Sequence, residues 1–247
     1  MHHSQLGLSV SRSVTTAIVL AGGLGTRLRD TVPDLPKPMA PVNGRPFLEF
    51  QLDFWIRQGV DRFILSVGYR SEAIIAHFGA SYRTARVEFA VEEAPLGTGG
   101  GLLLAAERLA DRSPFLLLNG DTFFEVKLAD LTDFHTARVS DWTFSLFRTN
   151  ESGRYMGMDV DVDGRIDSLR SGAGRSGQYA NGGVYLVNPE ILQSTAWRAQ
   201  DKLSLEDDLL PALFAASARL YGREFAGRFI DIGVPDDYLR CAAFLDA

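Results

Sequence analysis

The 247-residue chain contains a single cysteine, Cys241, so no disulfide can form within it. A protein without disulfides is typical of a reducing compartment, because small secreted domains commonly depend on several such bonds. We expect Cys241 to be a small packing residue in the last helix.

The sequence also lacks a long hydrophobic run and an excess of positive charge. No apolar run approaches the roughly 18 residues needed to span a bilayer, and residues 1–14 have neither the charged start nor the apolar core of a signal peptide. The formal net charge of −6 argues against a nucleic-acid or anionic-membrane surface. We predict a cytoplasmic protein with a small-molecule partner, no nucleic acid and no membrane, in which residues 1–14 are a flexible leader.

The first half of the chain alternates between strand-like and helix-like segments. Apolar runs occur near 15–21, 61–67, 85–91 and 114–119, and helix-like segments near 46–58, 71–78, 98–110 and 127–138. This alternation predicts a doubly wound, Rossmann-like α/β sheet of parallel strands flanked by helices, with ligands at the carboxyl ends of the strands.

From about residue 141 the pattern changes to short alternating strands near 142–148, 155–162, 165–169 and 178–187. They predict a mixed-sheet extension that forms a second wall of the site. A helix near 205–217, a strand pair near 218–232 and a closing helix from Pro235 are expected to complete the fold. We predict a single domain over 15–247 with one lobe at about 15–140 and another at about 141–247.

A glycine-rich loop follows the first expected strand. Residues 20–28 read Leu-Ala-Gly-Gly-Leu-Gly-Thr-Arg-Leu, so backbone N–H groups are offered to an anion where the strand ends. The loop lacks the Lys-Ser/Thr of a P-loop, and Leu28 stands where a dinucleotide fingerprint needs a small residue, which disfavours a nicotinamide-dependent oxidoreductase. Arg27 and Lys37 supply two positive charges for a polyphosphate; the alternative is a tight turn with two surface cations.

Two aspartates come directly after apolar strands. Asp121 follows the run Phe-Leu-Leu-Leu-Asn-Gly at 115–120, and Asp231 stands within Phe-Ile-Asp-Ile-Gly at 229–233. Carboxylates at strand ends can hold Mg²⁺ against substrate phosphates, since this ion commonly takes one or two protein carboxylates together with phosphate oxygens. Taken singly, each aspartate is also compatible with a turn or a helix cap.

A second glycine-rich turn, Glu-Glu-Ala-Pro-Leu-Gly-Thr-Gly-Gly-Gly at 92–101, also follows a strand and opens a helix. Its glycines leave room for a ribose or a base, and Glu92 can accept N–H groups from a base edge. Guanine offers N2–H₂ beside N1–H, whereas uracil has one ring N–H, which favours guanine. The alternative is a helix-capping turn without a ligand.

Asn181 and Glu206 are candidate readers of sugar hydroxyls, because polyol recognition needs short, rigid donors and acceptors. A carboxylate at a helix start also stabilises the helix dipole. That alternative applies to Glu206 and fits Asp207 and Asp208 better.

Several separated motifs, in order, resemble those of the sugar-1-phosphate nucleotidyltransferases. They are Gly-Gly-Leu-Gly-Thr-Arg-Leu (22–28), Pro-Lys-Pro-Met-Ala-Pro (36–41), Pro-Leu-Gly-Thr-Gly-Gly (95–100), Asn-Gly-Asp (119–121), Asn-Gly-Gly (181–183) and Ile-Asp-Ile-Gly-Val-Pro-Asp-Asp-Tyr (230–238). The resemblance covers about residues 15–240 and is nearest to the D-glycero-α-D-manno-heptose 1-phosphate guanylyltransferases of bacterial surface-polysaccharide synthesis.

The resemblance implies the nucleotide-diphospho-sugar transferase fold, with a nucleotide lobe (about 15–140) and a sugar lobe (about 141–247). It implies transfer of GMP from GTP to a sugar 1-phosphate with Mg²⁺ as cofactor. Arg27, Lys37 and Asp121 are the expected catalytic residues, and Asp121 and Asp231 the expected metal ligands. The expected nucleotide-binding residues are Leu20, Ala21, Gly22, Gly23, Gly25, Thr26, Glu92, Pro95, Gly97, Thr98 and Gly120. The expected sugar-binding residues are Gly157, Asn181, Gly182 and Glu206.

One departure from the family pattern concerns a lysine. Many relatives carry Phe-x-Glu-Lys after an Asp-x-x-Gly turn, and that lysine approaches the sugar phosphate, whereas this chain continues from Asp163-Gly-Arg-Ile166 into Asp-Ser-Leu-Arg-Ser-Gly at 167–172. Arg170, Arg175 and Lys202 are the candidate replacements.

Alternative substrates are mannose 1-phosphate with GTP and N-acetylmuramate 1-phosphate with UTP. A non-catalytic sugar-nucleotide-binding protein is a further alternative, although such a protein is expected to lose Asp121 or Asp231, and both are present. The sequence is also compatible with a homodimer.

Overall fold

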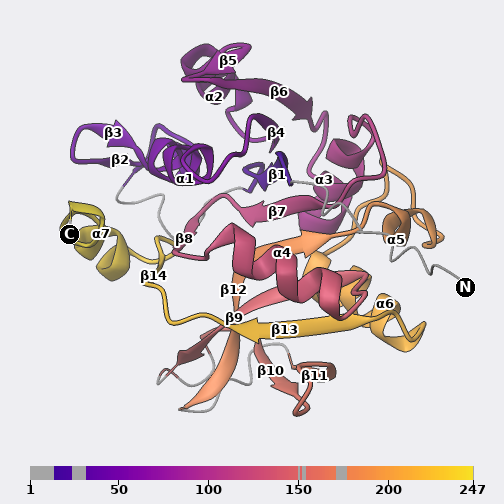
Figure 1. Ribbon diagram of the computed structural model, residues 1–247. Helices are drawn as coiled ribbons and strands as arrows, with labels where there is room; N and C mark the ends of the chain where they lie inside the picture. Colours follow the sequence, from indigo (N-terminus) through magenta and orange to yellow (C-terminus); the bar gives the residue numbers. More distant parts are fainter. Residues whose placement is uncertain (1–13, 24–31, 150, 152–153, 171–176, 247) are drawn as a thin grey trace, which may run out of the picture.

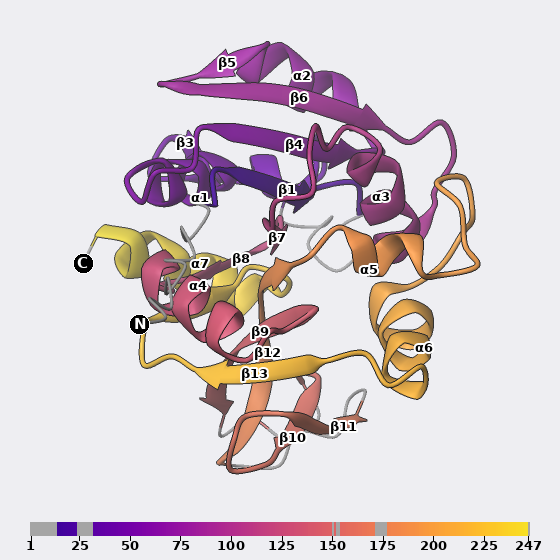
Figure 2. The same ribbon diagram turned by 45° about the vertical axis from the view of Figure 1, so that its right-hand side comes forward.

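The computed structural model describes residues 14–23, 32–149, 151, 154–170 and 177–246. A ten-stranded sheet contains strands from both halves of the chain, with a path of β11-β10-β12-β7-β1-β4-β6-β5. Off this path, β9 pairs with β12, and β13 pairs with β9. Figures 1 and 2 show helices on both sides of this sheet. Two small sheets, β14-β8 and β2-β3, complete the described strands.

The described strands have the following bounds: β1 Thr16–Leu20, β2 Pro41–Val42, β3 Arg45–Pro46, β4 Arg62–Val67, β5 Ser81–Tyr82, β6 Ala85–Val91, β7 Phe115–Asn119, β8 Thr122–Phe124, β9 Trp142–Thr149, β10 Gly157–Val160, β11 Ile166–Arg170, β12 Gln178–Val187, β13 Leu220–Glu224 and β14 Phe229–Asp231. The described helices are η2 Lys37–Met39, α1 Phe47–Ile56, α2 Ser71–Phe78, α3 Gly97–Ala106, α4 Leu128–Ala137, α5 Glu190–Gln193, η3 Leu205–Leu209, α6 Leu210–Ala215 and α7 Pro235–Asp246.

The first half is the predicted parallel unit. β1 pairs in parallel with β4 and with β7, and β4 pairs in parallel with β6. The carboxyl ends of these four strands therefore meet at one edge of the sheet, where ligands bind in open α/β folds.

The second half is joined to this unit by antiparallel pairing of β12 with β7 and of β9 with β12. The predicted pairing of two strands near 218–232 with each other is wrong: β13 pairs with β9, and β14 pairs with β8. β13 can extend the main sheet because its alternate residues Leu220 and Gly222 are buried there. The predicted helix near 205–217 is divided into η3, a π-helical turn, and α6; Pro211 near the start of α6 has no N–H to continue the regular ladder.

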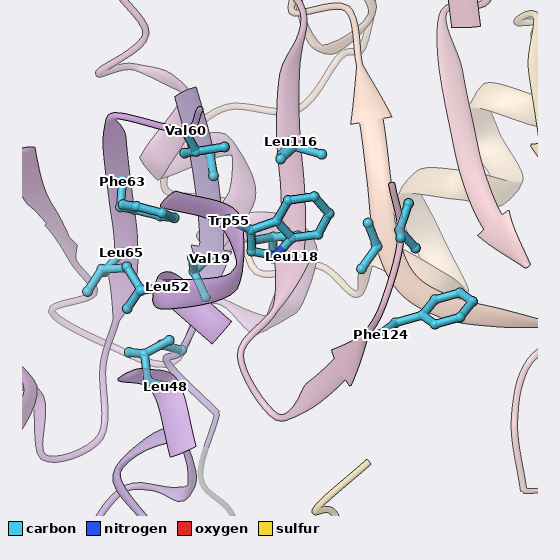
Figure 3. Packing of buried hydrophobic residues seen from close by; sticks show 14 of the residues in the cluster. Val19, Leu48, Leu52, Trp55, Val60, Phe63, Leu65, Leu116, Leu118 and Phe124 are labelled. Atoms are coloured by element: carbon cyan, nitrogen blue, oxygen red, sulfur yellow. The ribbon is translucent and has the colours of Figure 1, made fainter. Parts of the chain in front are cut away.

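Side chains of the central strands alternate between two cores. Val19 and Leu118 pack toward the core that contains Leu52 and Trp55 of α1, as Figure 3 shows. Their neighbours Ile18 and Leu117 belong to the opposite core, together with leucines of α3, η3 and α6. Both faces of the central strands are thus covered, and the strand ends are left to form the site.

The closing helix α7 packs on a smaller cluster that contains Cys241, whose side chain is buried. Burial raises the pKa of this thiol to about 12, in keeping with the predicted packing role. Within the described part of the chain, no helix has the length and apolar character needed to cross a membrane.

Candidate active site

A cavity of about 710 Å³ opens at the carboxyl ends of the parallel strands. Leu20, Ser66, Glu92 and Asn119, at or just beyond the ends of β1, β4, β6 and β7, all line it. The predicted nucleotide-binding residues Ala21, Gly22, Gly23, Pro95, Gly97, Thr98 and Gly120 line it as well. Gly25, Thr26 and Arg27 lie outside the described residues.

Backbone hydrogen bonds fix the turns that follow β1 and β7. The N–H of Ala21 donates to the carbonyl of Ser66 at 2.8 Å, and the N–H of Gly120 donates to the carbonyl of Leu20 at 2.9 Å. A Cβ on Gly120 would lie 2.6 Å from that carbonyl oxygen, so the approach of the two turns requires glycine. This contact sets the position of Asp121.

Asp121 and Lys37 form an ion pair in the wall of the cavity. The Lys37 Nζ donates to Asp121 Oδ2 at 2.7 Å, and the two side chains are 10% and 33% exposed. Buried Gln51 of α1 supports the turn, because its Nε2 donates to the carbonyls of Asn119 at 2.8 Å and of Thr122 at 2.7 Å. The turn that carries the carboxylate is therefore held from the core side.

Asp231 reaches the same place through the pairing of β14 with β8, in which it lies opposite Thr122. The N–H of Ile232 donates to the carbonyl of Asp121 at 3.0 Å. Burial raises the pKa of Asp231, and the negative charge of Asp121 raises it further, while Lys37 acts in the opposite direction. Two carboxylates from distant parts of the chain thus lie close enough to interact electrostatically, beside one lysine.

This donor set fits a hard divalent cation that also binds substrate. In the part of the chain that is described, no group of three or more His, Cys, Asp or Glu side chains forms a complete metal site. Two carboxylates that repel each other need a positive charge between them, and Mg²⁺ commonly takes one or two carboxylates plus substrate phosphates. Asp121 and Asp231 therefore suit a metal that arrives with, or is completed by, a phosphate group.

Glu92 lines the cavity beside Gly22 of the first glycine-rich loop. Its Oε2 accepts from the N–H of Leu96 at 3.0 Å, and its Oε1 accepts from the hydroxyl of Ser66 at 3.3 Å. A Cβ on Gly22 would lie 2.4 Å from Glu92 Oε1. These contacts hold the carboxylate in a fixed direction, and they are compatible with the helix-capping alternative. Each oxygen can still accept one more hydrogen bond, so the carboxylate can also bind a ligand.

Asn181 enters the cavity from a bulge in β12. The register with β9 shifts between Asn181 and Tyr185, and bulges commonly redirect side chains beside active sites. The Asn181 Nδ2 donates to the hydroxyl of Tyr185 at 2.7 Å, and its Oδ1 accepts from the N–H of Gly183 at 3.1 Å. The amide is therefore rigid.

Glu206 faces the cavity from η3. Its Oε2 accepts from the hydroxyl of Thr98 at 3.1 Å, and burial raises the pKa of the carboxyl. At the helix start the hydroxyl of Ser204 accepts from the N–H of Asp207, and Asp208 Oδ2 accepts from the N–H of Ser204. Asp208 therefore makes the capping contact that was the alternative role for these acids, while Glu206 contacts both Thr98 of the second glycine-rich turn and the hydroxyl of Ser204.

Two predicted sugar-side glycines are displaced by one residue from the cavity wall. Gly157 and Gly182 are not among the lining residues, whereas Met156 and Gly183 are. A Cβ on Gly182 would meet the ring of Phe124 at 2.5 Å, so this glycine faces the core. For Gly182 and Gly183 the bulge is the reason: β12 advances four residues from Asn181 to Tyr185 while β9 advances two, and the φ of Gly183 is 69°, so the regular alternation of faces is interrupted there.

The cavity also contains cations that the sequence left open or did not predict. Of the three candidates for the missing lysine, Lys202 lines the cavity; Arg175 and the side chain of Arg170 lie outside the described part. Arg154 lines it too, beside Tyr155, and sequence reasoning missed it. Its position directly before the expected strand at 155–162 was the available signal.

Fold and site together define a class: an α/β enzyme that binds a phosphorylated nucleotide at the carboxyl ends of parallel strands, beside two acidic residues suited to a divalent cation. The chain belongs to the nucleotidyl transferase family, whose sequence pattern matches residues 16–247. The predicted fold and enzyme class are thereby confirmed.

Two guanylyltransferases are similar to this chain over most of their length. The chain is 38% identical over 222 residues to the D-glycero-alpha-D-manno-heptose 1-phosphate guanylyltransferase of Aneurinibacillus thermoaerophilus, covering 90% of this chain and 94% of that protein. It is 36% identical to the enzyme of the same name from Campylobacter jejuni, covering 90% and 96%. The crystal structure of HddC from Yersinia pseudotuberculosis has a TM-score of 0.82 at 32% identity, covering 94% of this chain and 99% of that chain. HddC has also been solved in complex with GMP-PN.

Proposed function

We propose that this enzyme transfers GMP from GTP to D-glycero-α-D-manno-heptose 1-phosphate and releases pyrophosphate. A phosphate oxygen of the sugar attacks the α-phosphorus of GTP in line, the new P–O bond forms, and the bond to the β-phosphate oxygen breaks. The nucleophile is already an anion, so positioning and charge neutralisation supply the acceleration. The observation that carries the proposal is the meeting of Asp121, Asp231 and Lys37 in one cavity.

The proposed site residues fall into groups that bind the triphosphate, the metal ion and the sugar phosphate. Arg27 and the loop that carries it bind the triphosphate, and Lys37 bridges toward the sugar phosphate. Asp121 and Asp231 hold Mg²⁺, which when bound supplies charge stabilisation to the phosphate oxygens. Asn181, Glu206 and the neighbouring backbone bind sugar hydroxyls, and Lys202 is the proposed replacement for the family lysine.

Guanine selection is assigned to Glu92. Its fixed carboxylate accepts from guanine N1–H and N2–H₂, and uracil cannot offer the second donor. The relatives named for guanylyl transfer support this assignment. Glu92→Gln replaces one acceptor oxygen with a donor, so kcat/KM for GTP is expected to fall by about tenfold or more, with a smaller loss for ITP, which lacks the 2-amino group.

Pyrophosphate release over a panel of triphosphates and sugar phosphates tests the substrate assignment. The panel pairs GTP, ITP and UTP with D-glycero-α-D-manno-heptose 1-phosphate, mannose 1-phosphate and N-acetylmuramate 1-phosphate. The proposal expects the highest kcat/KM for GTP with the heptose phosphate. A higher value for mannose 1-phosphate or for UTP would replace the proposed substrate pair.

The reaction is proposed to take place in the cytoplasm, where its triphosphate substrate is made available. A homodimer stays a prediction, and the molar mass in solution tests it.

A further inference from the structure

Arg154 is a cavity residue with an unusual partner. Its side chain is 22% exposed and lines the catalytic cavity, while its Nη2 donates to Asp237 of α7, whose side chain is 3% exposed. The two residues are 83 positions apart in the sequence. A carboxylate this deeply buried is costly unless it is paired, so Asp237 depends on cationic partners such as Arg154.

Asp237 has a second arginine, which provides a comparison. Arg240, one turn further along α7, also donates to it. The Arg240 side chain is 70% exposed. It lines an adjoining hollow of about 650 Å³, which shares Tyr155, Phe229 and Asp231 with the catalytic cavity, and it does not line the cavity itself. The same carboxylate thus holds one arginine at the catalytic cavity and one outside it.

The orientation of Arg154 is fixed from more than one side. Its Nη1 donates to Glu151 at 2.8 Å, and its guanidinium lies 4.9 Å from the centre of the Tyr155 ring. The guanidinium has five N–H groups, and the bonds to Glu151 and Asp237 use two of them. The others remain for a planar, bidentate contact of the kind that arginine makes with phosphate.

The balance of charge in the cavity favours a contact between Arg154 and a phosphate. Within the described part of the chain, four carboxylates line it, from Glu92, Asp121, Glu206 and Asp231. Among the described lining residues the cations are Lys37, Arg154 and Lys202, and Lys37 is already bonded to Asp121. The ring of Tyr155, next to Arg154, packs edge-on against Phe229 with 5.4 Å between the ring centres. Phe229 begins β14, which ends at Asp231, so Arg154 lies on the Asp231 side of the cavity.

We propose that Arg154 binds the phosphate of the sugar 1-phosphate beside Asp231, and that Asp237 is the positioning residue that holds Arg154 there. The inference rests on the proposed function, because it requires a sugar phosphate in this cavity. Sequence-distant α7 thereby contributes to substrate binding without touching the substrate.

Steady-state kinetics of Arg154→Gln, Arg154→Lys, Asp237→Asn and Arg240→Gln test the proposal, with the KM for each substrate measured at saturation of the other. Loss of a charged hydrogen-bonding partner is expected to raise the KM for the sugar phosphate about 10- to 100-fold in Arg154→Gln, with little change in the KM for GTP. Arg154→Lys should recover part of this loss. Asp237→Asn should raise the same KM, and Arg240→Gln should behave like the wild type.

An unchanged KM for the sugar phosphate in Arg154→Gln would overturn the proposal, as would an equal rise in the KM for GTP. If Arg240→Gln caused the same loss as Asp237→Asn, Asp237 would be a structural residue and its positioning role would be wrong. Thermal unfolding of each variant identifies misfolding; if Asp237→Asn does not fold, the two Arg154 variants decide. A wild-type enzyme inactive with every sugar phosphate tried would refute the proposed function instead, so the two failures are distinct.

Discussion

Replacing Lys37 by glutamine separates the catalytic role of this cation from its structural role. Lys37 donates to Asp121 at 2.7 Å, and the pair is partly shielded, with 10% and 33% of the side chains exposed. A charge-assisted hydrogen bond contributes about 1.5–3 kcal/mol to stability. Because a third of Asp121 is open to water, the lower end applies, and we expect Lys37→Gln to reduce the free energy of unfolding by about 1–2 kcal/mol.

The expected loss of activity is larger than this loss of stability. Removing one preorganised charge from a phosphoryl-transfer site is expected to lower kcat by about 10²–10³, or about 2.7–4 kcal/mol in activation free energy. Pyrophosphate release at saturating substrates gives kcat, and chemical denaturation gives the free energy of unfolding.

Lys127→Gln is the matched control, because Lys127 pairs with Asp130 at 3.7 Å and is 72% exposed. Exposed pairs contribute little, so both readouts should stay near the wild-type values. Turnover of Lys37→Gln within about fivefold of the wild type would refute the catalytic reasoning, since even one lost donor is expected to cost about 10² or more.

Three further predictions concern the scaffold. Gly120→Ala places a Cβ 2.6 Å from the Leu20 carbonyl, so it should lower the free energy of unfolding by about 1–3 kcal/mol and reduce turnover by displacing Asp121; wild-type stability would contradict the clash. Val139 follows α4 with φ of 48° and is 62% exposed, so Val139→Asn should raise the free energy of unfolding by about 0.5–1 kcal/mol, and a decrease would be the contrary result. His135 is buried, and burial lowers its pKa below the ordinary 6.5. As the pH falls, the unfolded chain therefore binds the proton first, and the free energy of unfolding should decrease below about pH 6.5 by up to about 1.4 kcal/mol per pH unit. In His135→Gln the free energy of unfolding should depend less on pH in this range, and an unchanged pH dependence would exclude this histidine as the cause.

Strands and the residues that follow them were predicted best where the apolar runs are long. β1, β4 and β7 are largely buried on both faces, and β6 alternates buried with more exposed residues. Each therefore reads as a distinct hydrophobic segment, and the residues at the carboxyl ends could be assigned to one edge of a sheet. Much of the nucleotide side of the cavity could therefore be found before the structure.

Short elements and tertiary register could not be found in this way. β8 has three residues, too few for a period, yet its pairing with β14 brings Asp231 beside Asp121. The bulge after Asn181 brings Gly183 rather than Gly182 to the cavity wall, because the irregular register and the positive φ of Gly183 interrupt the alternation of faces along the strand. The meeting of Arg154 with Asp237 spans 83 positions, and no local pattern reports a contact of that kind.

The central claim is that Asp121 and Asp231 act as one unit, and a double-mutant cycle tests it most directly. Pyrophosphate release from GTP and the heptose phosphate is measured at saturating Mg²⁺ for Asp121→Asn, Asp231→Asn and the double variant, with thermal unfolding to confirm that each is folded. Residues that share one function are strongly non-additive, so each single change should reduce kcat/KM by about 10² or more, and the double variant should be little worse than the poorer single variant. Losses that multiply in the double variant, or near-normal turnover in either single variant, would contradict a shared role at the reacting phosphate.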